Sequence, residues 1–169
     1  VKKYLPDMVA KNQIRIVQLV FREQGLIVPN GNPKNIKGIE DLNRDDIVLI
    51  NRQAGSGTRI LLDYRLQQME LDPSNIKGYQ NEEFTHMSVA VAVLSQTADT
   101  GLGIYAAARA LNLDFIPVVT EQYDLVIPQP FFESPGVQTL LEVVRSTEFR
   151  KQVETLGGYS THKTGDILL

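Results

Sequence analysis

The residues best suited to chemistry form a glycine-rich turn between an apolar run and a helical pattern. Residues 51–59 (NRQAGSGTR) follow the aliphatic run 47–50 and precede a periodic segment that begins at Ile60. The N–H groups at a helix N-terminus lack partners, and the helix dipole favours negative charge there. Ser56 and Thr58 add hydroxyl donors, and glycine lets the backbone approach a ligand closely. The turn, with Gly57 at its centre, predicts an anion site; the alternative is that Ser56 only caps the helix.

A second helix start, at Thr85 and His86, is expected to contribute to the same kind of site. Thr85 precedes the helical pattern THMSVAVAVLSQ as an N-cap. Two converging helix N-termini can hold a tetrahedral oxyanion without neutralising its charge. Thr85 either contacts the anion or only caps its helix, and His86 either lines the site or lies on the surface. Arg59 either pairs with the anion or forms a surface salt bridge.

Several other conspicuous residues are interpreted as structural. Glu82 and Glu83 are neighbours on an extended segment, so they face opposite ways, which predicts a solvated charge pair and no acid–base pair. Asp99 is expected to bond the backbone or to orient a donor, because a carboxylate would repel an anion. A stripe of apolar residues is expected to be core: Val89, Val91, Val93 and Leu94.

Composition excludes several functional classes. The 169 residues are 43% hydrophobic and 22% charged with a net charge of −3, so the chain can bury a core but lacks a basic nucleic-acid surface. Without cysteine, and with only His86 and His162 as histidines, no metal site and no cofactor are expected. No apolar run approaches the ~18 residues that span a membrane. No Ser-His-Asp arrangement, Walker sequence or dinucleotide fingerprint is present, so no enzyme is predicted.

Strand and helix patterns alternate along the chain, which predicts an α/β fold with a mostly parallel sheet. Strands are expected at residues 14–21, 25–29 (a second strand or a continuation of the first), 47–51, 98–104, 115–120 and 123–128. Helices are expected at residues 39–42, 57–70, 85–96, 105–111, 134–145 and from 147 to the glycine pair 157–158. Ser134 followed by Pro135 is a helix start signal, and the tail is expected to be a loop with a short strand.

With the turn and these elements in place, the chain resembles the periplasmic-binding-protein-like (type 2) domain related to molybdate-binding proteins. Such domains occur at the C-terminus of molybdopterin-biosynthesis proteins and beside helix-turn-helix regulators. The matching segments cover roughly residues 1 to 160: REQGL (22–26), GNP (31–33), NRQ and GSGTR (51–59), LLDY (61–64), KGY (77–79), EE and TH (82–86), ADTGLGI (98–104), AARAL (107–111), LDFIP (113–117) and EQYDLVIP (121–128).

The resemblance implies two lobes, each a three-layer α/β/α sandwich, with a ligand cleft between them. Hinge strands near residues 19–28 and 115–127 would divide the chain into a first lobe, residues 1–28 and 117–169, and a second lobe, residues 29–116. Family members carry about half a lobe before the position of Val1. The first lobe is therefore expected to be incomplete in an N-terminally truncated chain, and its bare strand 14–21 and C-terminal helices predict self-association.

The function implied is that of a sensor or carrier domain for a small tetrahedral oxyanion, most simply molybdate or tungstate. The ligand would be held by Ser56, Gly57, Thr58, Arg59, Thr85, His86 and Tyr123, the last on the second hinge strand, where it could instead be a packing residue. The alternative is a regulatory domain for an organic anion or a molybdenum-cofactor precursor, for example in a transcription factor. A cytoplasmic location is expected, with periplasmic or extracellular locations left open, and neither membrane nor nucleic acid is an expected partner.

Overall fold

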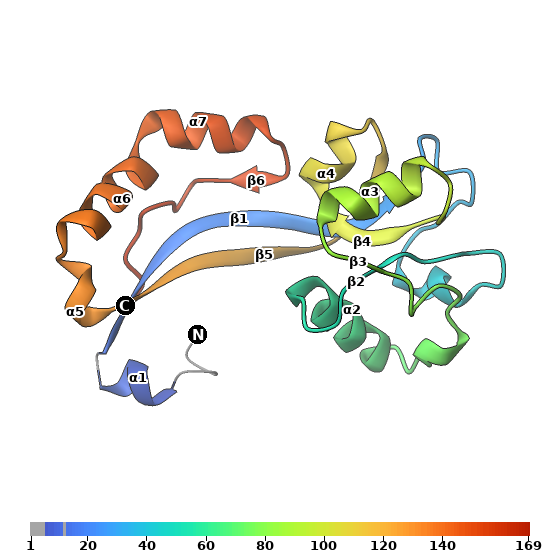
Figure 1. Cartoon of the computed structure of the whole chain (residues 1–169), viewed down its shortest axis with the longest axis horizontal. Coiled ribbons are helices and arrows are strands. Elements are labelled where there is room, and N and C mark those ends of the chain that lie inside the picture. The colour runs from blue at the N-terminus through green and yellow to red at the C-terminus, as the bar shows by residue number, and fades with distance from the viewer. Residues whose placement is uncertain (1–5, 12) are drawn as a thin grey trace. The chain divides into compact units, whose positions relative to one another are not determined.

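The computed structural model describes residues 6–11 and 13–169, and these form two compact units. The first unit comprises Val1–Arg22 and Glu121–Leu169, and the second comprises Glu23–Thr120. Strands β1 (Ile14–Val28) and β5 (Asp114–Pro128) each begin in one unit and end in the other (Figure 1). The mixed α/β, two-lobed fold expected from the sequence is confirmed.

Two long strands each join segments for which separate ranges were expected from the sequence; for β1, the alternative that residues 25–29 continue the first strand is confirmed. The segments 14–21 and 25–29 merge into β1, and the segments 115–120 and 123–128 merge into β5. Between the joined segments, Arg22 of β1 forms an ion pair with Glu121 of β5 within the first unit. Because these two charged side chains pair with each other, both strands can continue through the polar positions without a turn.

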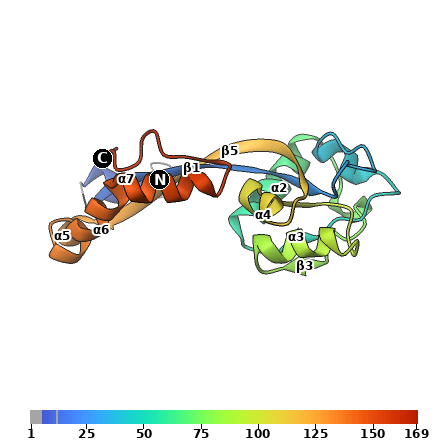
Figure 2. The ribbon, with the colours of Figure 1, turned by 90° about the horizontal axis from the view of Figure 1, so that it is seen from above.

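The second unit contains most of the regular elements. They are η1 (Ile39–Asn43), β2 (Asn51–Arg52), α2 (Gly57–Gln68), η2 (Pro73–Asn75), β3 (Glu82–Glu83), α3 (His86–Leu94), β4 (Gly101–Ile104) and α4 (Tyr105–Ala110). Side chains alternate across β1, so Leu26 and Val28 pack on the α2 side while Ile27 packs against α3 and α4. Figure 2 shows α3 and α4 together on one side of this unit. Helices thus cover both faces of the strands.

The expectation of a mostly parallel sheet is wrong. Strand β1 pairs antiparallel with β4, from Gln24 opposite Ile104 to Ile27 opposite Gly101. It also pairs antiparallel with β6 (Tyr159–Ser160). Among the pairings described, parallel geometry is confined to β2 with β3 and to a single bridge between Leu49 and Thr100. Alternating strand and helix patterns do not reveal direction when long strands pass between two units.

The expected strand 47–51 is shorter than its apolar run suggests. Ile47 and Leu49 are fully buried, but the regular strand contains only Asn51 and Arg52. Backbone bonds from this run alternate between two neighbours, because the Leu49 N–H donates to the carbonyl of Lys77 and the Ile50 N–H to that of Thr100. The segment is therefore extended and central without a continuous ladder to either neighbour.

The first unit combines the outer halves of β1 and β5 with β6 and four helices: α1 (Pro6–Ala10), α5 (Gln129–Phe132), α6 (Pro135–Arg145) and α7 (Thr147–Thr155). Its small core contains Val17, Ile127, Phe132 and Leu141. Pro135 begins α6 as expected, but the Ser134 hydroxyl donates to the carbonyl of Phe131 and makes no capping bond. Helices α1 and α5 were not expected, because each is only about one turn long and carries no periodic pattern.

Two expectations about burial are wrong. The apolar side chains of strand 14–21 are not bare, because Ile14, Ile16, Val17 and Val20 are all buried. The stripe on α3 divides, because Val89 and Val93 are buried whereas Val91 and Leu94 are about half exposed. The helical period places residues four apart on the same side, so only one half of the apolar stripe can face the strands. Among the described residues, no helix combines the length and apolar character that a membrane crossing requires.

Candidate functional site

The turn before α2 has the geometry of a capped helix start. Ser56 is extended, with φ −69° and ψ 146°, and its Oγ accepts a 3.2 Å hydrogen bond from the Arg59 N–H. Gly55 has φ +84°, a left-handed conformation that costs glycine little. The Ser56 N–H donates to the carbonyl of Gln53, which closes the turn. The capping role of Ser56 is thus confirmed, and an additional ligand role is compatible with it.

Three donors at this helix start are available to a ligand. Within the described part of the chain, the backbone N–H groups of Gly57 and Thr58 have no acceptor. Gly57 is exposed, and a Cβ placed on it would meet nothing within 4 Å. The Ser56 hydroxyl uses a lone pair for its cap, so its proton can be donated elsewhere. Two N–H groups and one O–H group at the positive end of a 12-residue helix form an anion-binding arrangement.

The Thr58 side chain is committed inside the second unit. It is 5% exposed, and its hydroxyl donates a 2.8 Å hydrogen bond to Oε1 of Gln24 on β1. Thr58 can therefore offer a ligand its backbone N–H but not its hydroxyl. Gln24 was not singled out from the sequence as a site residue. The available signal is an amide beside the apolar strand residues 26–28, where a buried polar group must find a partner.

Arg59 is held in a network of its own unit. Its Nε donates to Asp63 at 3.0 Å, one Nη donates to Glu82 at 3.1 Å, and its guanidinium lies 4.1 Å from the ring centroid of Tyr79. Burial would lower the pKa of Arg59, but bonds to Tyr79 and Asp63 hold it above its ordinary value. The pairing favours the salt-bridge interpretation, although the side chain is only 9% exposed and so does not lie on the surface.

Glu82 and Glu83 differ from the solvated pair that was expected. Glu82 accepts hydrogen bonds from Arg59 and from the backbone N–H of Ala54, so it ties the turn to β3. Among the described residues, no side-chain hydrogen bond joins Glu83 to the turn, and its carbonyl accepts from the Gln53 N–H and from the Arg52 guanidinium. The two side chains do point to opposite faces of the extended segment, as expected, but the face with Glu82 contacts the glycine-rich turn.

The second helix start lies beside the first because β2 and β3 are parallel. Asn51 is opposite Glu82 and Arg52 is opposite Glu83, so both chains leave the strands at their carboxyl ends. The Arg52 guanidinium donates to the carbonyls of Glu83 and Phe84 and braces the link to α3. Carboxyl ends of adjacent parallel strands, followed by helices on opposite faces, are where ligands bind in α/β folds.

Thr85 caps α3 as expected. Its Oγ1 accepts from the Ser88 N–H at 2.9 Å and lies 2.7 Å from the Ser88 hydroxyl. The His86 ring lies near Gly103 of β4, because a Cβ atom added to Gly103 would be 3.8 Å from Nδ1 of His86. A ligand role for Thr85 or His86 remains a prediction.

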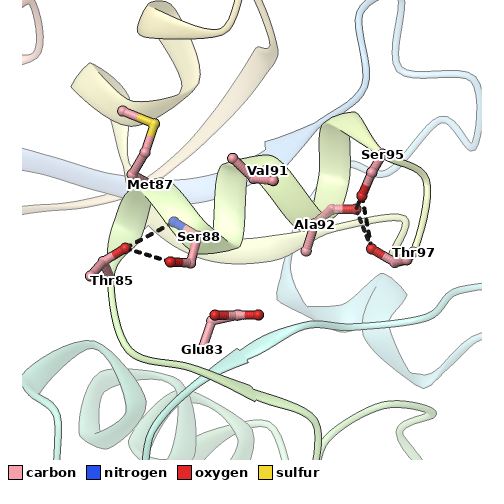
Figure 3. A pocket seen from close by; sticks show the side chains of 8 residues that line it. All are labelled: Glu83, Thr85, Met87, Ser88, Val91, Ala92, Ser95 and Thr97. Carbon is pink, nitrogen blue, oxygen red and sulfur yellow. Dashed lines mark hydrogen bonds between the residues drawn. The ribbon is translucent and has the colours of Figure 1, made fainter.

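A hollow of about 410 Å³ lies along α3 but does not include the glycine-rich turn. Thr85, Ser88, Ser95 and Thr97 line it with hydroxyls, Met87, Val91 and Ala92 line it with apolar groups, and Glu83 completes it. Figure 3 shows Glu83 opposite the middle of α3. A carboxylate facing the hollow would repel an anion, so the hollow is a poor anion site despite its size.

Tyr123 belongs to the first unit, whereas the other six predicted ligand residues belong to the second. The Arg22 guanidinium lies 4.4 Å from the centroid of its ring. Burial would lower the pKa of Arg22, but the Glu121 carboxylate holds it above its ordinary value. The packing interpretation of Tyr123 is favoured by this contact, and its ligand role remains a prediction.

Asp99 has the structural role that was expected. Its Oδ2 accepts a 2.8 Å hydrogen bond from the Val48 N–H, and its other oxygen lies 3.8 Å from the Lys34 ammonium. Among the described residues, no group of three His, Asp or Glu side chains is arranged to hold a metal ion. The chemistry available at the turn is therefore hydrogen-bond donation.

Comparison with known proteins gives both family and structural similarity. The family model described as PBP superfamily domain matches residues 2–145. The uncharacterized protein YvgK of Bacillus subtilis (strain 168) is 36% identical over 166 residues, which cover 98% of this chain and 53% of YvgK. The chain thus spans about half the length of that relative.

Two solved structures share the fold at low sequence identity. One, named for the substrate-binding domain of a molybdenum ABC transporter from Clostridium difficile, has a TM-score of 0.63 at 16% identity and covers 95% of this chain and 73% of that chain. The other, named for a phosphate ABC transporter substrate-binding protein with bound phosphate from Clostridium perfringens, has a TM-score of 0.58 at 13% identity and covers 87% of this chain and 72% of that chain.

Proposed function

Because the chain belongs to the PBP (periplasmic-binding-protein) superfamily of domains, we propose that it binds a small tetrahedral oxyanion, molybdate or tungstate, at the start of α2. The observation that carries the proposal is the set of three uncommitted donors: the N–H groups of Gly57 and Thr58 and the hydroxyl of Ser56. We further propose that the domain acts as a sensor or carrier and performs no catalysis of its own.

The charge balance around the turn favours binding by dipoles. Arg59 is already paired with Asp63 and Glu82, so its charge is largely cancelled before any ligand arrives. A helix N-terminus can hold an anion without a neighbouring cation. We therefore propose that Arg59 supports the turn through Glu82, which also accepts from Ala54, and does not contact the anion directly.

The donor-only chemistry favours fully ionised oxyanions. Molybdate, tungstate and sulfate carry no proton at neutral pH, whereas phosphate carries at least one. An O–H group of the ligand would need an acceptor at the site, and a buried donor without one costs about 1–3 kcal/mol. Molybdate and tungstate are larger than sulfate, so the spacing of the donors would separate them. Thr85, His86 and Tyr123 are proposed as further contacts on the grounds of family resemblance.

The setting proposed for the domain is molybdenum metabolism in the cytoplasm, including molybdopterin biosynthesis. The link to molybdenum is supported by the similarity in fold to a structure named for a molybdenum transporter, whereas the cytoplasmic and biosynthetic setting rests on the sequence resemblance alone. Elemental analysis of the protein purified from its native host would test the link to molybdenum directly. Bound molybdenum or tungsten would support it, and a protein free of both metals that binds molybdate tightly in vitro would place it in another process.

Isothermal titration of the full chain with molybdate, tungstate, sulfate and phosphate tests the ligand. Tight binding of the first two, with weak or absent response to the others, is the expected result. Equal affinity for sulfate would retain the oxyanion class but overturn the selectivity. Silence from all four anions would overturn the proposal and favour an organic anion as ligand.

A further inference from the structure

The first unit contains an apolar hollow of about 260 Å³ beneath α7. Its lining comes from four elements: Leu19, Val20 and Arg22 of β1, Tyr123 of β5, Phe149 and Val153 of α7 with Leu156 just beyond it, and Tyr159 of β6. All of these residues belong to the same unit. The hollow is therefore a property of one compact body, and none of its lining residues belongs to the turn before α2.

Helix α7 is amphipathic, yet its apolar face is not fully packed. Phe149, Val153 and Leu156 recur at helical spacing, which normally indicates a face buried in a core. None of the nine residues of α7 is buried, and Leu156 is 53% exposed. The apolar face of α7 is therefore partly exposed where it borders the hollow.

The volume suits a single ring with a substituent. An enclosed apolar cavity of about 150 Å³ binds benzene. The present hollow is open to solvent beside Leu156, has a larger volume of about 260 Å³, and is lined by three aromatic rings and four aliphatic side chains. Ligand pockets are mostly apolar with a few convergent polar groups, and this lining has that composition.

Arg22 supplies the polar group. Its side chain is 14% exposed, and its Nε and Nη2 are directed to the Glu121 carboxylate. Within the described residues, Nη1 has no acceptor. The ion pair with Glu121 cancels the charge of Arg22 but leaves the N–H groups of Nη1 to donate to a neutral acceptor on a ligand.

We propose that this hollow is a binding site for a small monocyclic aromatic molecule that carries a neutral hydrogen-bond acceptor. The ring lies against Phe149, Val153 and Leu156, and the acceptor receives a hydrogen bond from Arg22 Nη1. Apart from Tyr123, the residues that line this hollow differ from those proposed to bind the oxyanion, so the domain has two ligands of different chemistry.

Methyl NMR of the full chain with three probes tests the site. Benzamide has both the ring and a neutral carbonyl, toluene has only the ring, and acetamide has only the carbonyl. We expect benzamide to shift the methyl signals of Val20, Val153 and Leu156 saturably, toluene to bind more weakly, and acetamide to cause no shift. No benzamide shift at millimolar concentration, or equal shifts with acetamide, would overturn the proposal.

Two variants make the test specific to the hollow. Val153→Phe fills it and should reduce benzamide affinity at least tenfold, whereas Leu94→Phe places the same ring on an exposed position of α3 and should leave affinity unchanged. Arg22→Met should abolish the preference for benzamide over toluene. Benzamide binding that survives Val153→Phe would overturn the assignment. Repeating the titration in a Gly57→Pro background keeps this result separate from any failure of oxyanion binding.

Discussion

The hydroxyl of Thr58 donates a 2.8 Å hydrogen bond to Oε1 of Gln24, and both side chains are buried. The bond joins the first turn of α2 to β1, which are 34 residues apart in the chain. It fixes the orientation of the helix start whose N–H groups face outward. The position of the proposed anion donors therefore depends on a polar contact inside the second unit.

Removing either partner of this bond should destabilise the protein. Thr58→Val or Gln24→Leu removes one partner of a buried hydrogen bond, and each should lower the free energy of unfolding by about 1–3 kcal/mol. The double variant should lose less than the sum, because both polar atoms are then gone. Chemical denaturation measures all three, with Gln67→Leu as the control at an exposed glutamine. Strictly additive losses would contradict the coupling.

Gly57→Pro should abolish one anion donor while preserving the helix. Proline is well tolerated at the first helical position, and Ser56 already has the extended conformation that precedes proline. Loss of one hydrogen bond to a charged ligand, about 1.5–3 kcal/mol, should weaken molybdate binding roughly 10- to 150-fold. Gly57→Ala keeps the N–H and is the matched control. Calorimetric titration of both variants distinguishes the donor role from mere flexibility, and equal affinities would exclude the donor.

Arg59→Met should affect stability more than binding. The guanidinium bonds Asp63 and Glu82 and stacks on Tyr79, so its loss should reduce the free energy of unfolding by about 1–3 kcal/mol. Oxyanion affinity of the folded variant should change less than threefold. Glu83→Gln, at the neighbouring acid, should change the stability little. A large loss of affinity at unchanged stability would instead identify Arg59 as a ligand.

Tyr79 should link stability to alkaline pH. Burial, and then the hydrogen bond that its hydroxyl donates to Asp63 at 2.6 Å, raises the pKa of Tyr79 above its ordinary value. The folded state therefore favours the neutral phenol. This contribution is fully present below the ordinary tyrosine pKa of about 10 and is lost as pH rises through the higher folded value. Denaturation midpoints across this range should fall more steeply for the natural protein than for Tyr79→Phe; parallel curves would contradict the shift.

Self-association of the isolated chain is expected through α6. Leu140 and Val143 are 47% and 53% exposed on that helix, and clustered apolar exposure marks contact surfaces. Light scattering at micromolar concentration should report species larger than a monomer. Leu140→Lys with Val143→Lys should shift the population toward monomer. A monodisperse monomer in the natural sequence would refute the expectation.

The sequence determined the local features of this protein. Ser56 and Thr85 were recognisable as helix caps, and both make the capping bond expected of them. Asp99 was expected to bond the backbone, and it does. The matched motifs indicated a periplasmic-binding-protein-like domain, and the comparisons show the PBP superfamily, whereas the relation to molybdate-binding proteins stays a proposal. Caps and turns depend on residues only a few positions apart, so their physics can be read from sequence.

Only the tertiary structure decided how distant segments meet. Nothing in the sequence indicated that Gln24 bonds Thr58, that Glu82 bonds Arg59 across 23 residues, or that half of the α3 stripe faces solvent. Strand direction was likewise misjudged, because the pairings that define it join residues as far apart as Gln24 and Ile104. The type of a residue indicates whether its side chain needs a polar or an apolar partner, but the packing of the whole unit determines which residue becomes that partner.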